Sequence, residues 1–288
     1  MERSAREIAD SFRIRGSATI EICGNLPGLT EKQEALLNEY QERFNGVGKP
    51  LTDKQNLERL ELFKKRDFDE LPEGAKTHCK KWLKSFLYKR REELKNKYVD
   101  KGNECEESGF TVMAVQLKLG MVYKNTERRR NEFAEGECDL NHQEVIYDNK
   151  CSWSLDTFPM FETEIPDPKY WWQLQNYSTN WPAKKLCLCY TLISATFDMV
   201  EQAVKWSETP DSKYRIAERM VYTQKDFELL KSALFPESEL DTFVEIPEER
   251  RIKPFYFEPE LWAQQMIEKR SNMCKEYIYQ LLIASGYK

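Results

Sequence analysis

Two aspartates and a lysine near the middle of the chain have the residue types and spacing for metal-assisted chemistry on a phosphate. Asp139 is followed nine residues later by Asp148, and Lys150 comes two residues after Asp148. Asp148 and Lys150 end an apolar segment, residues 145–147. Burying an acid and a lysine there is costly unless a further charged group lies between them. A divalent metal ion or a phosphate meets that requirement, and Asp139 could supply a second carboxylate to the same ion.

Residues 135–153 are expected to form two short strands joined by a polar turn. Because side chains of a strand point alternately to opposite faces, Asp148 and Lys150 would share one face and Asn149 would lie on the other. Two or three carboxylates suffice for Mg²⁺, which prefers oxygen ligands and keeps several waters. Bound Mg²⁺ activates a water and neutralises the leaving oxygen of a phosphodiester. The alternative is that Asp139 and Asp148 simply end strands at turns, and that Lys150 is a solvated strand end.

Two further motifs flank this segment. Gly102-x-x-x-Glu106 precedes it and Gln173-x-x-x-Tyr177 follows it. Together with the two aspartates and the lysine, they resemble the signature of the PD-(D/E)xK nuclease superfamily, with Cys138 in place of the proline. The first motif resembles the helix start before the core of lambda-exonuclease and YqaJ-type phage recombination nucleases. The second resembles the QxxxY helix that follows the core in those and in RecB-like nucleases, so the resemblance covers roughly residues 101–190.

The resemblance implies a restriction-endonuclease-like α/β fold, with a central mixed sheet of about five strands flanked by helices. It also implies a site for two Mg²⁺ ions, with Mn²⁺ able to substitute. The implied ligands are Glu106, Asp139, Asp148 and the backbone carbonyl of Asn149. Lys150 would position or deprotonate the attacking water, and Gln173 and Tyr177 would orient the site. Since Gln173 and Tyr177 lie one helical turn apart, they could instead only pack or hydrogen-bond locally.

The activity implied by the resemblance is Mg²⁺-dependent exonuclease digestion of linear duplex DNA, 5′ to 3′, in phage-type recombination. Duplex ends and a single-strand annealing protein would be its partners, and the chain would form a ring, often a trimer. A structure-specific or restriction-type endonuclease with the same core is one alternative. A DNA-binding or scaffold protein without turnover is a second, and a helical interaction protein with an accidental motif is a third.

Several residues near the core are candidates for DNA contact: Lys124, Arg128, Arg129, Arg130, Ser152 and Trp153. The resemblance implies that the basic ones contact the DNA backbone or a terminal 5′-phosphate, and an ordinary basic surface loop is the alternative. Trp171 and Trp172 could stack on an unpaired base or pack in the core. Ten lysines and arginines also lie between Lys76 and Lys101. They form either a solvated helix face or a wall of a DNA channel.

Composition favours a packed globular protein and limits the partners. The formal net charge of −5 argues against general nucleic-acid affinity, although a local basic groove is compatible with it. Residues 186–197 form the longest apolar stretch, which is too short to span a bilayer. The N-terminus lacks an apolar signal core. We therefore expect no membrane partner and a cytoplasmic location, in the host cytoplasm if the protein is phage-encoded. The eight cysteines lack zinc-site spacing and are expected to be buried free thiols.

Residues 1–100 are expected to form a helical region packed on the core, and residues 101–288 the nuclease core with C-terminal helices. Thr30 with Gln33, and Thr52 with Gln55, predict two helix starts by the capping-box pattern, and a third helix is expected to begin near Glu73. The expected strands are 119–123, 132–134 with 137–140, 144–152, 186–193 and 214–222. The expected helices beyond residue 100 are 101–117, 170–180, 224–234 and 260–285, with a proline-marked link before the last.

Overall fold

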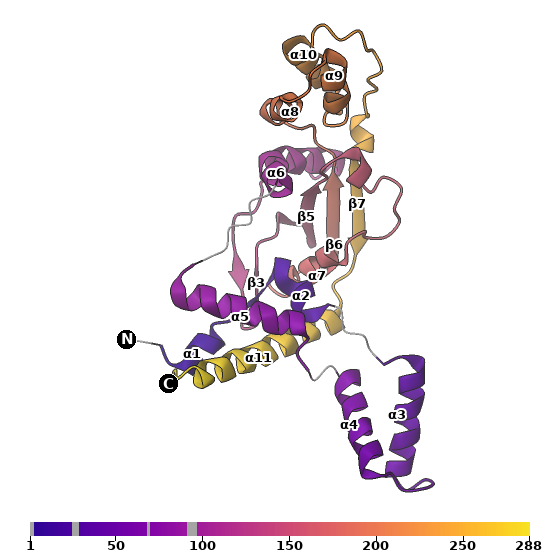
Figure 1. Ribbon diagram of the computed structural model, residues 1–288, viewed down its shortest axis with the longest axis vertical. Coiled ribbons are helices and arrows are strands. Elements are labelled where there is room, and N and C mark those ends of the chain that lie inside the picture. The colour runs from indigo at the N-terminus through magenta and orange to yellow at the C-terminus, as the bar shows by residue number, and fades with distance from the viewer. Residues whose placement is uncertain (1–2, 25–28, 68–69, 91–96) are drawn as a thin grey trace. The chain divides into compact units, whose positions relative to one another are not determined.

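The computed structural model describes residues 3–24, 29–67, 70–90 and 97–288, with the backbone alone for residues 97–103. It has the predicted mixed α/β composition (Figure 1). The chain divides into two compact units. The first contains Met1–Arg91, Arg130–Glu135 and Leu261–Lys288, and the second contains Glu92–Arg129 and Gly136–Glu260.

The long helix α11 (Leu261–Ala284) organises the first unit. It contacts α1 (Ala5–Asp10), α2 (Thr19–Cys23) and α5 (Glu73–Tyr88). Its fully buried side chains recur every three or four residues, which places them on one face of the helix. These side chains are Ala263, Ile267, Arg270, Ser271, Cys274, Ile278 and Leu282.

Helices α3 (Glu31–Phe44) and α4 (Asp53–Arg66) pack against each other as a helical hairpin. Both predicted capping boxes are confirmed. Thr30 and Thr52 each accept a hydrogen bond from the backbone three residues ahead, at 3.3 Å in both cases. Such caps satisfy the free N–H groups of the first helical turn, which is why these short polar sequences start helices here.

A small sheet in the order β1-β3-β2 combines β1 (Ile14–Arg15), β3 (Ala134–Gly136) and β2 (Arg129–Arg130). Strands β1 and β3 are parallel, with Ile14 opposite Ala134. The predicted strand over residues 132–140 is therefore divided. Of its residues, Ala134 belongs to β3, and Leu140 begins a strand of a different sheet.

The second unit is built on a four-stranded sheet. Its order is β4 (Leu140–His142), β5 (Val145–Cys151), β6 (Lys185–Thr191) and β7 (Ile252–Phe257). Strands β5 and β6 are parallel, and the other two pairs are antiparallel. Helix α7 (Pro168–Tyr177) crosses between β5 and β6 and packs on one face, whereas α6 (Lys97–Gln116) packs on the other. An apolar core lies on each face of the sheet. Strands β5 and β6 are therefore buried on both faces.

Three helices after β6 form a cluster with its own core: α8 (Phe197–Val204), α9 (Pro210–Glu218) and α10 (Gln224–Leu234). The prediction of a strand at 214–222 is wrong. Tyr214 and Ala217 are buried at helical spacing, and Thr209 caps the helix while Pro210 occupies its first turn. Proline suits that position because its missing N–H would be unpaired there anyway.

Two further predictions about strands are wrong. Residues 119–123 are not a strand, since Lys118 and Gly120 have φ angles of 56° and 75°, and Met121 and Tyr123 are 88% and 79% exposed. Conversely, the proline-marked link contains β7. Pro254 is tolerated because β7 lies at the edge of the sheet. A strand there has a neighbour on one side only, so the missing N–H of proline need not interrupt a hydrogen bond between strands. The sheets therefore have four and three strands in place of one sheet of five.

The remaining fold predictions concern thiols and membranes. All eight cysteines are free, and seven of them are buried, as predicted. In the described part of the chain, the helices lack the combination of length and apolarity needed to cross a membrane. The predicted basic run falls partly on residues 91–96, which lie outside the described residues. Short 3-10 turns complete the fold at Gly16–Ala18, Leu155–Thr157 and Glu248–Arg250.

Candidate active site

A tight hairpin between β4 and β5 determines where the two aspartates lie. Gln143 and Glu144 join the strands with φ angles of 49° and 61°. Positive φ angles at both positions give the two-residue turn that matches the twist of paired strands. Continuing the antiparallel register of β4 and β5 by one residue places Asp139 opposite Asp148. The Asn149 N–H donates to Asp139 Oδ2 at 2.6 Å, and this hydrogen bond holds the carboxyl at the end of the hairpin.

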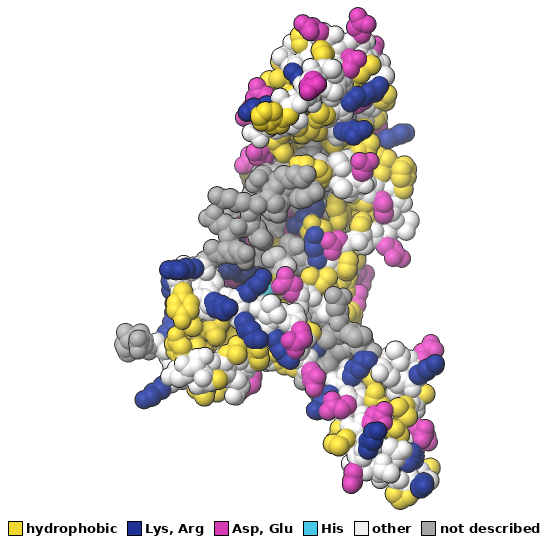
Figure 2. All heavy atoms as spheres, viewed as in Figure 1, with side chains coloured by type: hydrophobic (Ala, Val, Ile, Leu, Met, Phe, Trp, Pro, Cys, Tyr) yellow, Lys and Arg dark blue, Asp and Glu magenta, His cyan; other side chains and the backbone are white. Residues whose placement is uncertain are grey.

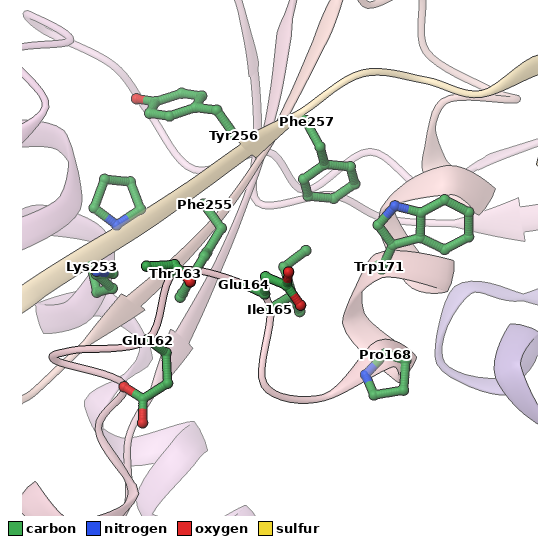
Figure 3. Close-up of a pocket in the computed structure, with 11 residues that line it drawn as sticks. Glu162, Thr163, Glu164, Ile165, Pro168, Trp171, Lys253, Phe255, Tyr256 and Phe257 are labelled. Atoms are coloured by element: carbon green, nitrogen blue, oxygen red, sulfur yellow. The ribbon is translucent and has the colours of Figure 1, made fainter.

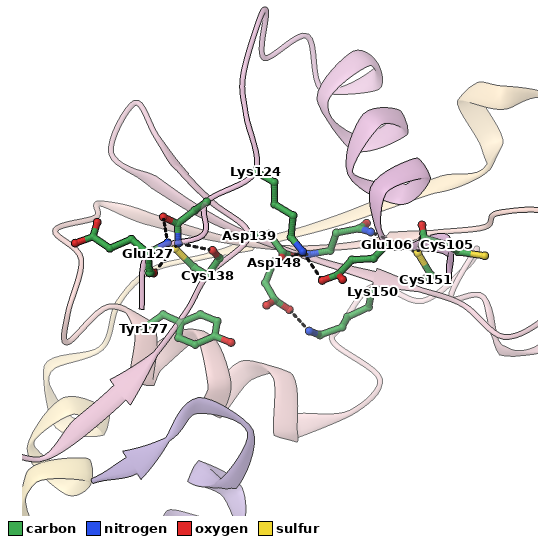
Figure 4. A network of polar contacts seen from close by, with 12 residues as sticks. Cys105, Glu106, Lys124, Glu127, Cys138, Asp139, Asp148, Lys150, Cys151 and Tyr177 are labelled. Atoms are coloured by element: carbon green, nitrogen blue, oxygen red, sulfur yellow. Dashed lines mark hydrogen bonds and ion pairs between the residues drawn. The ribbon is translucent and has the colours of Figure 1, made fainter. Parts of the chain in front are cut away.

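Asp148 and Lys150 share one face of β5, as the alternation predicts. Their side chains form an ion pair, with Lys150 Nζ 2.5 Å from Asp148 Oδ2 (Figure 4). Asp148 is only 2% exposed, whereas the Lys150 side chain is 24% exposed. Asn149 faces α6, where Thr191 Oγ1 donates to its side-chain oxygen at 3.1 Å. Gly109 of α6 lies against the same spot, since a Cβ there would be 2.9 Å from Thr191 Oγ1.

Helix α7 supplies polar contacts to the buried carboxylate. Gln173 Nε2 lies 3.4 Å from Asp148 Oδ1 and donates to the Tyr177 hydroxyl at 2.6 Å. Both side chains are buried, so the pair is oriented by packing as well as by hydrogen bonds. Tyr170, on the same helix, places its ring 5.2 Å from Lys150 Nζ, a distance at which the aromatic face attracts the ammonium. The helix therefore contacts both members of the ion pair.

The two aspartates are coupled electrostatically. Burial, followed by the charge of Asp148, raises the pKa of the Asp139 carboxyl from 3.8 to about 7, despite the opposing effects of Lys150, the Asn149 N–H and Lys124. An acid with a raised pKa favours its neutral form in the folded protein. The free energy of unfolding therefore falls as the pH rises from about 3.8, the ordinary pKa of the group, through about 7, its pKa in the folded protein. Burial alone would lower the pKa of Lys150, but Asp148 outweighs it and the pKa is raised. The charge of Asp148 thus raises the pKa of both of its neighbours, Asp139 and Lys150.

Glu106 reaches the site from α6 through Lys124. The Lys124 ammonium lies 2.5 Å from Glu106 Oε1 and 4.0 Å from Asp139 Oδ1, and Figure 4 shows its ion pair with Glu106 as a dashed line. The Glu106 side chain is 47% exposed, so it can turn without breaking a packed core. The ammonium occupies a position that a cation shared by Glu106 and Asp139 would also require.

The chemistry of these donors fits Mg²⁺ in part. Carboxylate oxygens are the ligands that Mg²⁺ prefers, and a divalent cation would relieve the repulsion between Asp139 and Asp148. Asp148 Oδ2 is buried and contacts the Lys150 ammonium at 2.5 Å. However, no three Asp, Glu, His or Cys side chains among those residues lie close enough to form a ready metal site. Glu106 is instead paired with Lys124, whose ammonium also lies 4.0 Å from Asp139 Oδ1.

Replacing Lys124 with methionine is expected to raise the affinity for Mg²⁺. The apolar side chain keeps the length of lysine but removes the cation that competes for Glu106 and Asp139. A competing unit charge about 4 Å away at an effective dielectric constant near 20 corresponds to about 4 kcal/mol as an upper bound, so a tenfold tighter dissociation constant is within reach. Isothermal titration calorimetry with MgCl₂ measures it, and Lys225→Met, an exposed lysine of α10, is the control. Unchanged affinity would show that Lys124 does not compete.

Gly136 lies directly against Tyr177. A Cβ at position 136 would be 2.5 Å from Cε1 of that ring, so Gly136→Ala forces the tyrosine out of place. Overpacking of this kind typically costs about 1–3 kcal/mol. We expect the free energy of unfolding to fall by that amount, and any DNA cleavage to fall with it because Tyr177 holds Gln173. Chemical denaturation measures the first effect. Glu208→Ala, at an exposed position of the same unit, should change neither, and a stable Gly136→Ala protein would contradict the packing argument.

The residues predicted to contact DNA lie in varied surroundings. Arg128 pairs with Glu137 at 3.7 Å, and Arg129 pairs with Glu127 at 2.9 Å, so acidic neighbours partly neutralise both. Arg130 is exposed and belongs to the first unit. Trp153 is half-buried, and together with Ser154 it lines a cavity of about 850 Å³ beside α8 and α9.

Burial makes Ser152 a poor candidate for DNA contact. It is 5% exposed, and its N–H donates to the Thr191 carbonyl at 2.8 Å. Its surface is not open to a DNA strand. The expected strand 144–152 included Ser152, but strand alternation alone does not show which residues other elements cover.

A second cavity of the same unit, about 560 Å³, lies beside the edge strand β7 (Figure 3). Phe255, Phe257 and Trp171 form its apolar side, and Glu162 and Lys253 its charged side. The predicted stacking residue Trp171 therefore packs beside β7, with its ring 6.5 Å from that of Phe257. Neither cavity is lined by Asp139, Asp148 or Lys150.

Comparison with known proteins identifies the fold. No protein-family model matches the chain, and no curated protein matches it. Among solved structures, a phage-related exonuclease from Haemophilus somnus 129PT superposes with a TM-score of 0.64 at 21% identity, over 96% of this chain and 97% of that one. The chain has the fold of that exonuclease. An alkaline exonuclease from Laribacter hongkongensis, LHK-Exo, superposes with a TM-score of 0.50 at 10% identity, over 97% and 96% of the two chains.

Sequence reasoning overlooked two residues that contact the site. Tyr170 lies three residues before Gln173 and seven before Tyr177, which puts all three on one face of a helix, so the spacing could have revealed it. Lys124 was assigned to DNA contact alone. Its pairing with Glu106 joins α6 to the segment before β4, and no local pattern indicates such a contact.

Proposed function

We propose that this protein is a Mg²⁺-dependent deoxyribonuclease of the PD-(D/E)xK type that digests linear duplex DNA from its ends, 5′ to 3′. One observation carries the proposal. The β4–β5 hairpin brings Asp139 opposite Asp148 and pairs Asp148 with Lys150 at 2.5 Å, in a fold shared with a phage-related exonuclease. A buried carboxylate and a second, partly buried one beside an ammonium are costly for a purely structural role, whereas hydrolysis of a phosphodiester uses all three groups.

The chain's own residues divide the work as follows. Asp139, Asp148 and Glu106 would hold the metal, together with the backbone carbonyl of Asn149. That carbonyl faces the Asp139 side because a strand residue directs its N–H and C=O to the same neighbour, and the N–H of Asn149 bonds to Asp139. When bound, one or two Mg²⁺ or Mn²⁺ ions would activate water and neutralise the leaving oxygen.

The remaining site residues position groups. The Lys150 ammonium would orient the attacking water and stabilise the negative charge that develops on the phosphate. Gln173 and Tyr177 would keep Asp148 in place through their hydrogen bonds. Lys124, Arg128, Arg129 and Arg130 would contact DNA phosphates, and Trp153 the strand near the cleaved bond.

The test compares linear and closed DNA. End-labelled linear duplex with 5′-phosphate or 5′-hydroxyl ends is incubated with the protein in Mg²⁺, beside a covalently closed plasmid. Loss of the linear duplex from its 5′ ends, an intact plasmid and full inhibition by a chelator are expected. Nicking or linearisation of the plasmid would replace the exonuclease with a structure-specific or restriction-type endonuclease of the same fold.

A second candidate is a DNA-binding or scaffold protein without turnover. The observation in its favour is that Asp148 is already paired with Lys150, and that the described residues contain no ready three-ligand metal site. It predicts duplex binding without cleavage in either Mg²⁺ or Mn²⁺. Heat release on titration with MgCl₂, followed by cleavage, would exclude it.

Assembly and partners belong to the same proposal. A ring-shaped oligomer, such as a trimer threaded by DNA, would show in light scattering as a mass of three times 34.3 kDa. A single-strand annealing protein would be the partner that takes up the exposed strand, in the cytoplasm of the cell.

A further inference from the structure

Helix α5 and the two residues after it concentrate positive charge in an otherwise acidic chain. Residues 73–90 contain six lysines and arginines and one glutamate, although the whole chain has a formal net charge of −5. The α3–α4 hairpin of the same unit is the opposite case, with eight acids and eight bases over residues 31–67. Figure 2 shows dark blue side chains gathered over α5, and blue and magenta mixed over the hairpin.

The charge lies on one face of α5. Ala75, Cys79 and Leu83 are buried on the opposite face, where they pack in the core of the first unit. Three lysines are exposed and form no ion pair with the described residues: Lys80, Lys81 and Lys84. The patch made by these three lysines is called the α5 patch below.

Three neighbouring cations are left out of the patch. Arg90 lies beyond the C-cap of the helix, and the other two have ordinary structural roles. Lys76 pairs with Glu73 at 2.7 Å, which neutralises it within the first turn. Lys89 is the C-cap of the helix, and its Nζ lies 4.7 Å from the centre of the Phe86 ring. A cation there stabilises the helix end through its dipole. The α5 patch has no such structural role, because removing its charges would leave every contact of the core in place.

The spacing of the α5 patch suits the backbone of duplex DNA. Lys80 and Lys84 are four residues apart, which is about 6 Å along a helix that rises roughly 1.5 Å per residue. Phosphates follow one another at about 3.4 Å along the axis of each strand, so the pair spans about two of them. Unpaired lysines on an exposed helix face can bind such phosphates, and binding is favoured by the release of counterions from the DNA. Contacts of this kind do not depend on the base sequence.

We infer that the α5 patch is a second, sequence-independent DNA-binding site, which holds the phosphates of the duplex that the proposed nuclease digests. This inference rests on the proposed function, which identifies duplex DNA as the polyanion that the patch would bind. The α5 patch lies on the first unit, whereas the proposed catalytic residues lie on the second. A protein with this site would keep hold of duplex DNA when the metal site is empty.

Fluorescence anisotropy with a labelled duplex of about 30 base pairs, measured in EDTA at several salt concentrations, tests the inference. Lys80→Gln/Lys84→Gln is expected to raise the dissociation constant at about 0.1 M salt on the order of tenfold or more. Its plot of log affinity against log salt should be less steep by about 1.8, since each phosphate contact contributes about 0.9. Lys81→Gln/Lys84→Gln repeats the test should the first variant be poorly folded by circular dichroism.

The matched control is Lys32→Gln/Lys54→Gln, which removes two exposed lysines from the α3–α4 hairpin of the same unit. Its affinity and salt slope should equal those of the wild type. An equal loss in this control, an unchanged slope in both α5 variants, or binding of phosphatidylserine vesicles in place of duplex would overturn the inference. Because EDTA prevents metal-dependent turnover, duplex binding without any cleavage in Mg²⁺ would refute the proposed function and leave the α5 patch standing.

Discussion

Replacing Asp148 with asparagine is expected to slow the degradation of linear duplex DNA by about 10³-fold or more, since each factor of ten corresponds to about 1.4 kcal/mol and a metal ligand contributes several kcal/mol. The amide keeps the size of the carboxylate and its contact with Gln173. It loses the charge that holds a divalent cation, at a position that is only 2% exposed. Degradation of an end-labelled duplex in Mg²⁺ measures the rate, and calorimetry measures the loss of metal affinity.

The fold should survive this substitution. The neutral amide would no longer compensate the charge of Lys150, but it would also end the repulsion between Asp139 and Asp148 that contributes to the raised pKa of Asp139. These effects oppose each other, so we expect the melting temperature to change by only a few degrees. Asp241→Asn, an exposed aspartate of the same unit, is the matched control and should retain full activity. An active and folded Asp148→Asn protein would remove Asp148 from the proposed site.

The central part of the site could be predicted because it is encoded locally. Asp148 and Lys150 share a face through strand alternation, and Asp139 lies opposite Asp148 because a two-residue turn fixes the register of a hairpin. Gln173 and Tyr177 share a face through helical spacing. Each of these relations needs only a short stretch of chain, so periodicity was enough to place the residues. Their roles in metal binding and catalysis remain predictions.

The errors arose where tertiary context decides the structure. The apolar residues of 214–222 fit the spacing of a helix as well as that of a strand. The N-cap Thr209 and Pro210 in the first turn are the features that indicate a helix. Strand β7 contains Pro254, which argues against a strand unless the strand is known to lie at a sheet edge. The contact between Lys124 and Glu106 joins segments 18 residues apart. No local pattern reports such a contact, although it determines whether Glu106 is available to a metal.

Lys150→Ala is expected to reduce turnover about 10²- to 10³-fold, which is the usual loss when one group that stabilises transition-state charge is removed. The affinity for Mg²⁺ should remain or increase, because the lysine is not a proposed ligand and its charge opposes a cation. This pattern of lost turnover with retained metal binding separates Lys150 from Asp148. Single-turnover cleavage and calorimetry, carried out on the same preparation, measure the two quantities.

Stability gives a second readout for the same variant. Without Lys150, the buried Asp148 loses its counter-charge at 2.5 Å, and breaking a buried pair costs up to about 3–5 kcal/mol, less here because the lysine is 24% exposed. The metal-free variant should therefore melt earlier than the wild type, and Mg²⁺ should raise its melting temperature by more, because a ligand stabilises the state that binds it. Lys185→Ala, an exposed lysine at the start of β6, should show neither change. If Lys150→Ala cleaved DNA at the wild-type rate, the lysine would be a structural partner of Asp148 and the water would have to be oriented by another group.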